Sequence, residues 1–178
     1  MVNQLLTLAR AEPESAVRQD RQPIDLQRMA AEVTAELVPR ALQAGVDLGF
    51  DEPVAGEGKA APAQVRGIDL LLREALVNLI DNAIRYAGRG ATVTVRVLPR
   101  GQAVHLEVED NGPGVPEGER EHVFERFVRA TTDGNGCGLG LAIVREIVER
   151  HAGQVSLQAV RPHGLLARVV LPSALMLR

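Results

Sequence analysis

The sequence predicts an α+β protein, a two-layer α/β sandwich with helices on one face of a mixed, mostly antiparallel sheet. Apolar and polar residues alternate in four runs that pair as two hairpins, 92–98 with 104–109 and 154–160 with 165–171. Apolar residues recur at helical spacing in three longer segments, 27–44, 69–87 and 139–151. A sheet with one apolar face needs a second layer to cover it, and amphipathic helices supply that layer.

The N-terminal part of the chain predicts several short elements. A brief amphipathic helix at 1–11 ends before Pro13. Because about 12 residues are marginal for an isolated helix, we interpret residues 1–12 as the end of a longer one. The elements expected next are a polar linker at 13–22, a strand at 23–26, the helix at 27–44, a strand at 46–50 and a loop rich in glycine, alanine and proline at 52–63.

The helix at 69–87 is the most clearly marked element. Asp69 is placed to cap its N-terminus and Gly88 to end it. A long loop at 111–138 is rich in glycine and charge, and a short apolar and aromatic turn at 123–127 interrupts it. We expect residues 23–173 to form one domain and 174–178 a tail.

Composition excludes several classes of function. A chain of 178 residues suits one domain with a substantial core. The net charge of -3 is spread along the chain and forms no basic stripe, which argues against nucleic acid as a partner. No apolar run approaches the ~18 residues that span a bilayer, so we expect no membrane contact by this chain. A single cysteine, Cys137, fits a reducing compartment.

A polar stripe runs along the middle helix. Glu74, Asn78 and Asn82 are four residues apart and share one side of an otherwise apolar helix. A solvated helix face is one explanation, but lysine or glutamate is more usual there than asparagine. The asparagine amide oxygen can instead join phosphate oxygens and water around Mg²⁺. Arg85 and Tyr86 then add a phosphate-pairing cation and an aromatic face.

A second constellation follows the strand at 104–109. Asp110 comes directly after that strand, and Gly112 and Gly114 follow within the run Asp-Asn-Gly-Pro-Gly. The carboxylate can accept a hydrogen bond from an exocyclic amine such as that of adenine, and the glycines let a ligand approach the backbone. A simple Asp-Gly turn is the alternative.

A third, glycine-rich constellation leads into the last helix at Gly134, Gly136, Gly138 and Gly140. Backbone N–H groups at a helix N-terminus attract anions, because they are unpaired and the macrodipole is positive there. Phosphate is therefore the expected ligand. The run lacks the Lys-Ser/Thr ending of a P-loop, and Leu141 stands where the dinucleotide motif needs glycine. A flexible hinge is the alternative.

In this order the constellations resemble the ATP-binding domain of sensor histidine kinases, whose Bergerat fold is shared with gyrase, mismatch-repair and chaperone ATPases. Residues 78–86 resemble the N box of that family, 110–114 the G1 box, 124–127 the F box and 136–141 the G2 box. The resemblance covers about residues 24–172, and four boxes in sequence are far more specific than any one of them.

The resemblance implies ATP and Mg²⁺ as cofactors. Asn82 would ligate Mg²⁺, with Asn78 assisting at the metal or the phosphates. Asp110 would bind the adenine amino group, and Tyr86 would border the ring. The other residues implied to bind the cofactors are Arg85, Gly112, Gly114, Gly136, Gly138, Leu139 and Gly140. Arg85 stands where the family often has lysine, and Arg129 matches an arginine that can reach the γ-phosphate.

One departure separates this chain from the hydrolysing relatives. Those relatives carry glutamate where this chain has Asn78, and an amide cannot take the proton of an attacking water. The resemblance therefore implies a phosphotransfer kinase whose catalytic residues are Asn78, Arg85 and Arg129. Glu74, one helical turn away, leaves slow hydrolysis open.

The phosphoacceptor is expected outside this chain. The histidines are His105, His122, His151 and His163, and none lies in the pattern of the family's phosphoacceptor helix. Structural roles are expected for all of them, and a positive ring at His151 would suit the end of a helix.

The resemblance implies that the γ-phosphate passes to a histidine on a separate dimerisation and phosphoacceptor domain, of which residues 1–12 resemble the last helix. A response regulator would act downstream. The expected location is the cytoplasm, with the parent kinase anchored in the inner membrane. A nucleotide-gated protein-interaction module and an anti-sigma-type serine kinase of the same superfamily are the alternatives.

Overall fold

The computed structural model describes residues 21–52, 63–113 and 137–174, with the backbone alone for 137–139. In chain order the elements are β1 (Gln22–Asp25), α3 (Leu26–Ala44), β2 (Asp47–Phe50), β3 (Gln64–Gly67), α4 (Asp69–Ala87), β4 (Thr92–Arg100), β5 (Ala103–Asp110), α5 (Cys137–Arg150), β6 (Gln154–Ala159) and β7 (Leu165–Pro172). None of the helices in these ranges is both long and apolar enough to cross a membrane.

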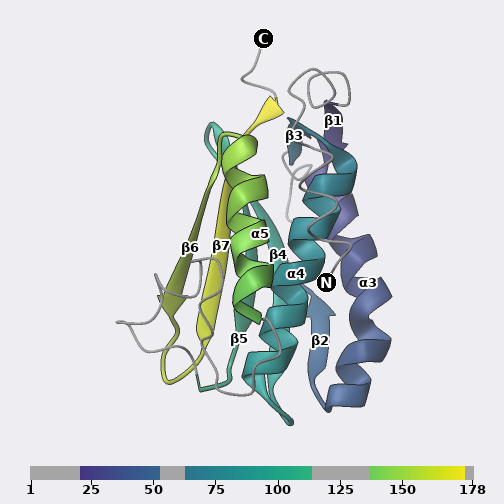
Figure 1. Cartoon of the computed structure of the whole chain (residues 1–178), viewed down its shortest axis with the longest axis vertical. Coiled ribbons are helices and arrows are strands. Elements are labelled where there is room, and N and C mark those ends of the chain that lie inside the picture. The colour runs from purple at the N-terminus through teal and green to yellow at the C-terminus, as the bar shows by residue number, and fades with distance from the viewer. Residues whose placement is uncertain (1–20, 53–62, 114–136, 175–178) are drawn as a thin grey trace, which may run out of the picture.

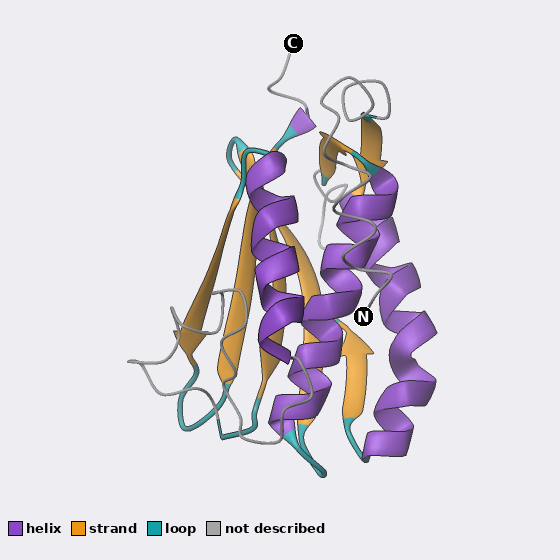
Figure 2. Ribbon diagram, viewed as in Figure 1, coloured by secondary structure: helices purple, strands orange, loops and turns teal. Residues whose placement is uncertain are grey.

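The fold has two layers, as the sequence predicts (Figure 1). A five-stranded sheet has the order β2-β4-β5-β7-β6, in which only β2 and β4 pair in parallel. Helices α3, α4 and α5 lie over one face of this sheet (Figure 2). A second, two-stranded sheet pairs β1 with β3 near the start of α4. The predicted fold class is therefore confirmed.

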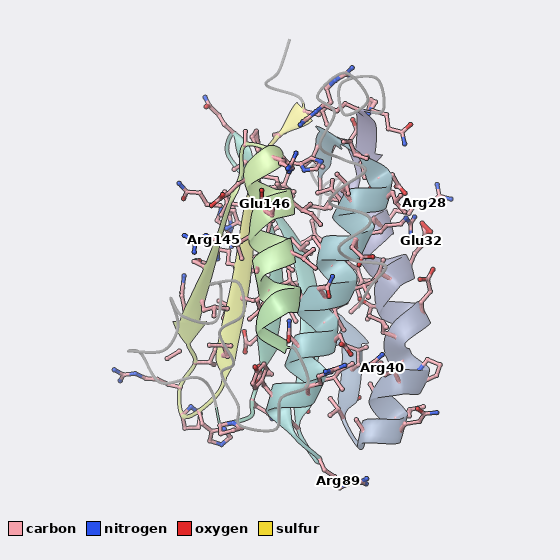
Figure 3. All side chains as sticks on the ribbon, in the orientation of Figure 1. Arg28, Glu32, Arg40, Arg89, Arg145 and Glu146 are labelled. Carbon is pink, nitrogen blue, oxygen red and sulfur yellow. The ribbon has the colours of Figure 1, made fainter. Side chains whose placement is uncertain are left out.

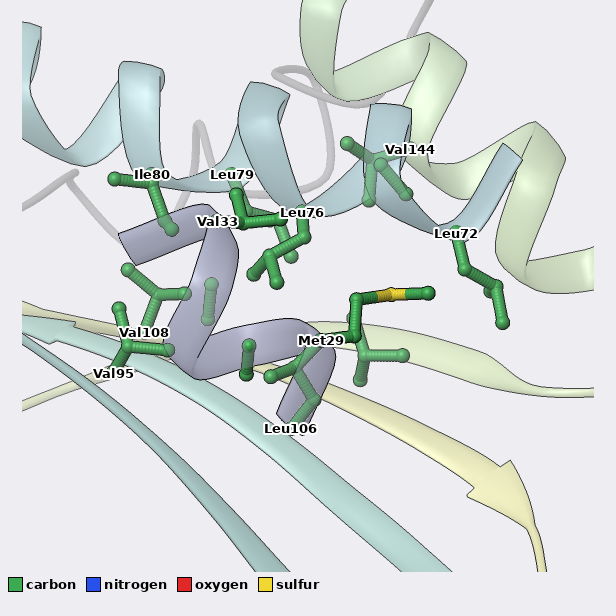
Figure 4. Close-up of a cluster of buried hydrophobic side chains, with 14 of the residues drawn as sticks. Met29, Val33, Leu72, Leu76, Leu79, Ile80, Val95, Leu106, Val108 and Val144 are labelled. Atoms are coloured by element: carbon green, nitrogen blue, oxygen red, sulfur yellow. The ribbon is translucent and has the colours of Figure 1, made fainter. Parts of the chain in front are cut away.

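The core fills the space between the two layers. Val93, Val95 and Val97 alternate along β4 and are at most 1% exposed, because successive residues of a strand face opposite sides. Leu76 and Ile80 of α4 are fully buried above them. Figure 4 shows side chains of α3 and α4 gathered over the strands. The apolar faces identified in the sequence thus meet in one layer.

The far face of the sheet carries an ionic cluster at its centre. Glu107 of β5 accepts hydrogen bonds from Arg168 at 2.7 Å and from Arg96 at 3.2 Å. Burial alone raises the pKa of Glu107, but the two guanidinium groups outweigh it and leave the pKa below its ordinary value. The carboxylate therefore remains ionised between two neighbouring strands.

Three details of the structure differ from the sequence-based expectation. The strand β3 was not predicted, and α5 begins at Cys137 rather than 139. The predicted cap at Asp69 is wrong: Ile68 precedes α4 and makes no side-chain cap. Asp69 lies inside the first turn and accepts a hydrogen bond from Arg73 at 2.9 Å. The predicted end of α4 at Gly88, with a φ of 83°, is confirmed.

His151 joins the end of α5 to the start of α4. Its Nε2 accepts the backbone N–H of Ile68 at 3.1 Å, and its Nδ1–H donates to the carbonyl of Ile147 at 2.8 Å. Only the neutral ring can make both bonds, since Nε2 must accept. Burial is the main cause that lowers the pKa of His151, the Ile147 carbonyl opposes it, and Arg21 lowers it further. The positive ring expected from the helix dipole is therefore wrong.

We predict that acid destabilises the fold through His151. The unfolded chain takes up a proton at this histidine near its ordinary pKa of 6.5, whereas the folded chain does so only at lower pH. The stability that the neutral His151 ring contributes is present above the ordinary pKa of 6.5. It is lost as the pH falls below 6.5 toward the lower pKa of the folded chain. Denaturant unfolding of the wild type between pH 7.5 and 5.5 should show this loss, and His151→Gln should flatten the profile.

The pKa of His105 is also lowered, by burial and then by Arg168, so that residue contributes in the same direction. His105→Gln is the control variant, because His105 is less buried than His151 and makes no bond that holds two helices together. It should keep most of the pH dependence. An unchanged slope in His151→Gln would show that this prediction is wrong.

Candidate functional site

An open hollow lies between α4, the start of α5 and the strands β5, β6 and β7. The residues that line it are Leu79, Asn82, Ala83, Tyr86, Val108, Asp110, Leu141, Leu157, Leu165 and Ala167. Aliphatic side chains dominate this lining, and the polar groups come from only three of its residues. Such a hollow suits a flat apolar ring held by a few directional bonds.

Asp110 is the charged residue of the hollow. It ends β5 on the strand face that carries Leu106 and Val108 toward the helices, and it is only 4% exposed. Burial is the main cause that raises the pKa of Asp110, and the charge of Glu109 raises this pKa further. Hydrogen bonds from the backbone amides of Gly112 and Leu165 lower it in part. A buried carboxylate of this kind gains from any ligand that donates a further hydrogen bond to it.

The turn after Asp110 is held on two sides. The backbone N–H of Gly112 donates to Asp110 Oδ1 at 2.9 Å, and Asn111 Oδ1 accepts the backbone N–H of Thr92 at 2.8 Å. Gly112 also lies directly against the end of α4, where an added Cβ would come within 2.5 Å of Ala87 Cα. Only glycine fits this position without backbone movement, so close packing fixes where the carboxylate points.

The predicted polar stripe faces inward. Asn78 and Asn82 are 5% and 8% exposed, so they do not form a solvated helix face. Asn78 Nδ2 donates to the carbonyl of Glu74 at 2.8 Å, which leaves Oδ1 on the side of α5. A Cβ added to Gly140 would lie 3.2 Å from Asn78 Oδ1 and 3.4 Å from Asn82 Nδ2. The start of α5 therefore packs directly on the asparagines.

The structure thus brings together the three constellations that the sequence singled out. Asn82, Tyr86 and Asp110 line one hollow, Asn78 and Gly140 adjoin it, and Gly112 holds the turn beside it. Arg85 lies elsewhere: its Nε is 3.3 Å from Asp81 Oδ2.

Asp81 also binds Arg40 of α3, whose Nε is 2.7 Å from Asp81 Oδ1. Arg40 is labelled in Figure 3, which places it between α3 and α4. The ion pair of Asp81 with Arg40 therefore ties these two helices together.

Several predicted site residues lie outside the described residues. They are Gly114, Gly134, Gly136, Arg129 and the F-box segment 124–127. Gly138 and Leu139 lie in the first turn of α5, where the backbone alone is described. The nearest fully described residue of that run is Gly140, which is buried against α4.

Sequence reasoning missed the wall residues of the hollow that come from β6 and β7. Leu157 comes from β6, and Leu165 and Ala167 come from β7. The alternation within 165–171 already indicated that residues 165, 167, 169 and 171 share one face of a strand. What could not be predicted is that β7 pairs with β5 so that Leu165 lies opposite Asp110.

The comparison of sequences decides the family. Residues 67–175 match the family described as histidine kinase-, DNA gyrase B- and HSP90-like ATPases. The chain belongs to this family. The match contains α4, β5, α5 and β7, the four elements from which most of the hollow is built.

Individual relatives are sensor kinases. The chain is 38% identical over 175 residues to the sensor protein kinase PmrB of Pseudomonas aeruginosa, covering 97% of this chain and 35% of that protein. It is 36% identical over 178 residues to the sensor protein CutS of Streptomyces coelicolor, covering 97% of this chain and 40% of that protein. The chain therefore spans between a third and two fifths of the length of these two relatives.

Solved structures share the fold. The mycobacterial sensor histidine kinase MprB is 31% identical, with a TM-score of 0.69, over 85% of this chain and 97% of that one. The hollow described above therefore belongs to a fold found in a sensor histidine kinase.

We predict that Gly112→Ala lowers the free energy of unfolding by about 1–3 kcal/mol, the usual cost of an overpacked methyl group. The added Cβ would meet the backbone of Ala87, which cannot turn aside as a side chain could. Gly49→Ala in β2 is the matched control, since nothing lies within 4 Å of its Cβ position. Denaturant unfolding should separate the two variants, and equal stabilities would contradict the close packing.

Proposed function

We propose that this chain is the ATP-binding catalytic domain of a two-component sensor histidine kinase, which transfers the γ-phosphate of ATP to a histidine on a separate phosphoacceptor domain. The observation that carries the proposal is the convergence of Asn82, Asp110 and the start of α5 around one hollow. Sensor kinases among the relatives support it.

The adenine ring enters the aliphatic part of the hollow in this proposal. The amino group of adenine donates a hydrogen bond to the Asp110 carboxylate. This bond is favourable because the carboxylate is buried. Tyr86 borders the ring, and Leu165 and Ala167 pack on it. The nucleotide is thus oriented by one charged acceptor within apolar walls.

Mg²⁺ and the phosphates lie toward α5. Within the part of the chain that the structure describes, no group of three or more His, Cys, Asp or Glu residues could hold a metal ion. The residues present fit a different arrangement, because Asn82 and Asn78 offer buried amide groups beside the start of α5. Asn82 would hold Mg²⁺, which completes its shell with phosphate oxygens and water and neutralises their charge.

The chemistry of this chain is positioning and charge neutralisation. Gly136, Gly138, Leu139 and Gly140 would hold the phosphates through their backbone, and Gly112 and Gly114 would border the base. Asn78 orients the phosphates, and Arg85 and Arg129 pair with their oxygens. The attacking nitrogen comes from another domain, because an amide at position 78 cannot deprotonate water.

The remaining partners follow from this role. The chain binds the dimerisation and phosphoacceptor domain of its parent kinase. A response regulator takes the phosphoryl group downstream. The domain acts in the cytoplasm, beneath a parent protein anchored in the inner membrane.

We predict that two substitutions weaken nucleotide binding in different ways. Asp110→Ala should weaken ATP binding by about 10- to 100-fold with or without Mg²⁺, as expected for a lost bond to a charged group. Asn82→Ala should instead remove the gain in affinity that Mg²⁺ gives the wild type. Calorimetric titrations of ATP with and without Mg²⁺ measure both effects.

Asp47→Ala is the control for these titrations, because Asp47 is exposed at the start of β2, away from the hollow. It should bind as the wild type does. Unchanged binding by both Asp110→Ala and Asn82→Ala would mean that the site is wrongly assigned.

We predict that radiolabelled ATP, mixed with this domain and a separate phosphoacceptor domain, gives acid-labile label on that domain. Asn82→Ala should abolish the transfer. Nucleotide binding without any transfer would favour a nucleotide-gated interaction module, and acid-stable label on a serine protein would favour an anti-sigma-type kinase.

A further inference from the structure

The loop between β6 and β7 lies directly against the turn that carries Asp110. The backbone of Gly164 approaches this turn so closely that an added Cβ would meet the carbonyl of Asp110 and lie 3.1 Å from Asn111 Cα. Its φ of 134° also favours glycine. The N–H of Val160 donates to the Gly164 carbonyl at 3.2 Å and closes the loop on itself. The loop is therefore an ordered neighbour of the turn.

A side-chain hydrogen bond from His163 joins this loop to the turn. Its Nδ1 lies 3.2 Å from the carbonyl oxygen of Gly112, and the two residues are 51 positions apart in the sequence. A carbonyl can only accept, so Nδ1 carries the hydrogen. The residue as a whole is exposed. Burial in the core therefore does not account for the position of this ring, and the contact with Gly112 is a specific polar one.

Gly112 is the residue through which this contact reaches Asp110. Its N–H donates to Asp110 Oδ1 at 2.9 Å, while its carbonyl receives His163. On the other side it packs against Ala87, and the amide of Leu165, two residues after His163, opposes the rise in the pKa of Asp110. The hairpin of β6 and β7 thus makes two bonds to this region. Leu165 bonds to the Asp110 carboxylate, and His163 bonds to the turn that orients this carboxylate.

We propose that His163 is a positioning residue for the base-reading carboxylate: it donates Nδ1–H to the Gly112 carbonyl and so holds the turn in which Gly112 aims Asp110 at the amino group of the purine. This inference rests on the proposed function, since it needs a purine nucleotide in the hollow. His163 itself does not touch the nucleotide. Its loss should therefore affect recognition of the amino group more than binding of the phosphates.

The test compares ATP with purine riboside triphosphate, which lacks the amino group. Calorimetric titrations use the wild type, His163→Ala, His163→Asn and His163→Gln. His163→Ala should weaken ATP binding by about 3- to 10-fold, the range expected for one hydrogen bond. Its affinity for purine riboside triphosphate should stay within about 2-fold of the wild-type value, which is also a check that the variant is folded.

The two amide variants distinguish a specific bond from a general structural role. The amide nitrogen of asparagine can occupy the place of Nδ1, whereas that of glutamine reaches the place of Nε2. His163→Asn should therefore restore ATP affinity and His163→Gln should not. In an Asp110→Ala background, His163→Ala should have no further effect on ATP binding.

Several results would overturn the inference. Equal losses for the two nucleotides, failure of asparagine to rescue, or a full effect in the Asp110→Ala background would each show that His163 does not act through Asp110. These outcomes differ from a failure of the proposed function, in which the wild type would bind neither nucleotide or would not distinguish them.

Discussion

The burial of the Asp110 carboxylate at the end of β5 is the constraint on which the rest of the site depends. Because burial raises its pKa, the folded chain holds the proton of Asp110 more tightly than the unfolded chain does. Stability is therefore lost as pH rises above the ordinary range of aspartate, and at neutral pH the ionised group costs folding free energy. The amides of Gly112 and Leu165 offset part of this cost. These amides come from the turn after Asp110 and from the start of β7, which lies opposite Asp110.

Helix α4 meets two demands at once. Its fully buried residues Leu76 and Ile80 anchor it on the sheet, while Asn78 and Asn82 are buried on its α5 side. A neutral amide is much less costly to bury than a carboxylate, particularly when it bonds within its own helix as Asn78 does to Glu74. Gly140 then allows α5 to begin directly against both amides. The helix can therefore carry polar side chains at the site while these side chains stay buried between α4 and α5.

The parts of this structure that could be predicted are those that local physics decides. The bounds of α4 follow from its apolar spacing and from Gly88, and the hairpin of β4 and β5 follows from alternation. Strand β3 could not be predicted, because residues 64–67 become a strand only by pairing with the distant β1. The contact of His163 with Gly112 could not be predicted either, because this contact depends on the pairing of β7 with β5. The candidate residues of the hollow were recognised as separate motifs, whereas its aliphatic walls required the assembled sheet.

Arg85 lies outside the hollow in an ion pair with Asp81, and the proposed phosphate role would require it to leave this pair. Arg85 is bound to Asp81, and the side chain of Arg85 is 37% exposed, so this is a surface ion pair. Such pairs contribute roughly 0–1 kcal/mol, because water competes with both partners. Moving Arg85 toward a phosphate would leave Asp81 paired with Arg40, whose Nε lies closer to it at 2.7 Å. Because of this second arginine, the Asp81 carboxylate would keep an ion-pair partner if Arg85 turned toward a phosphate.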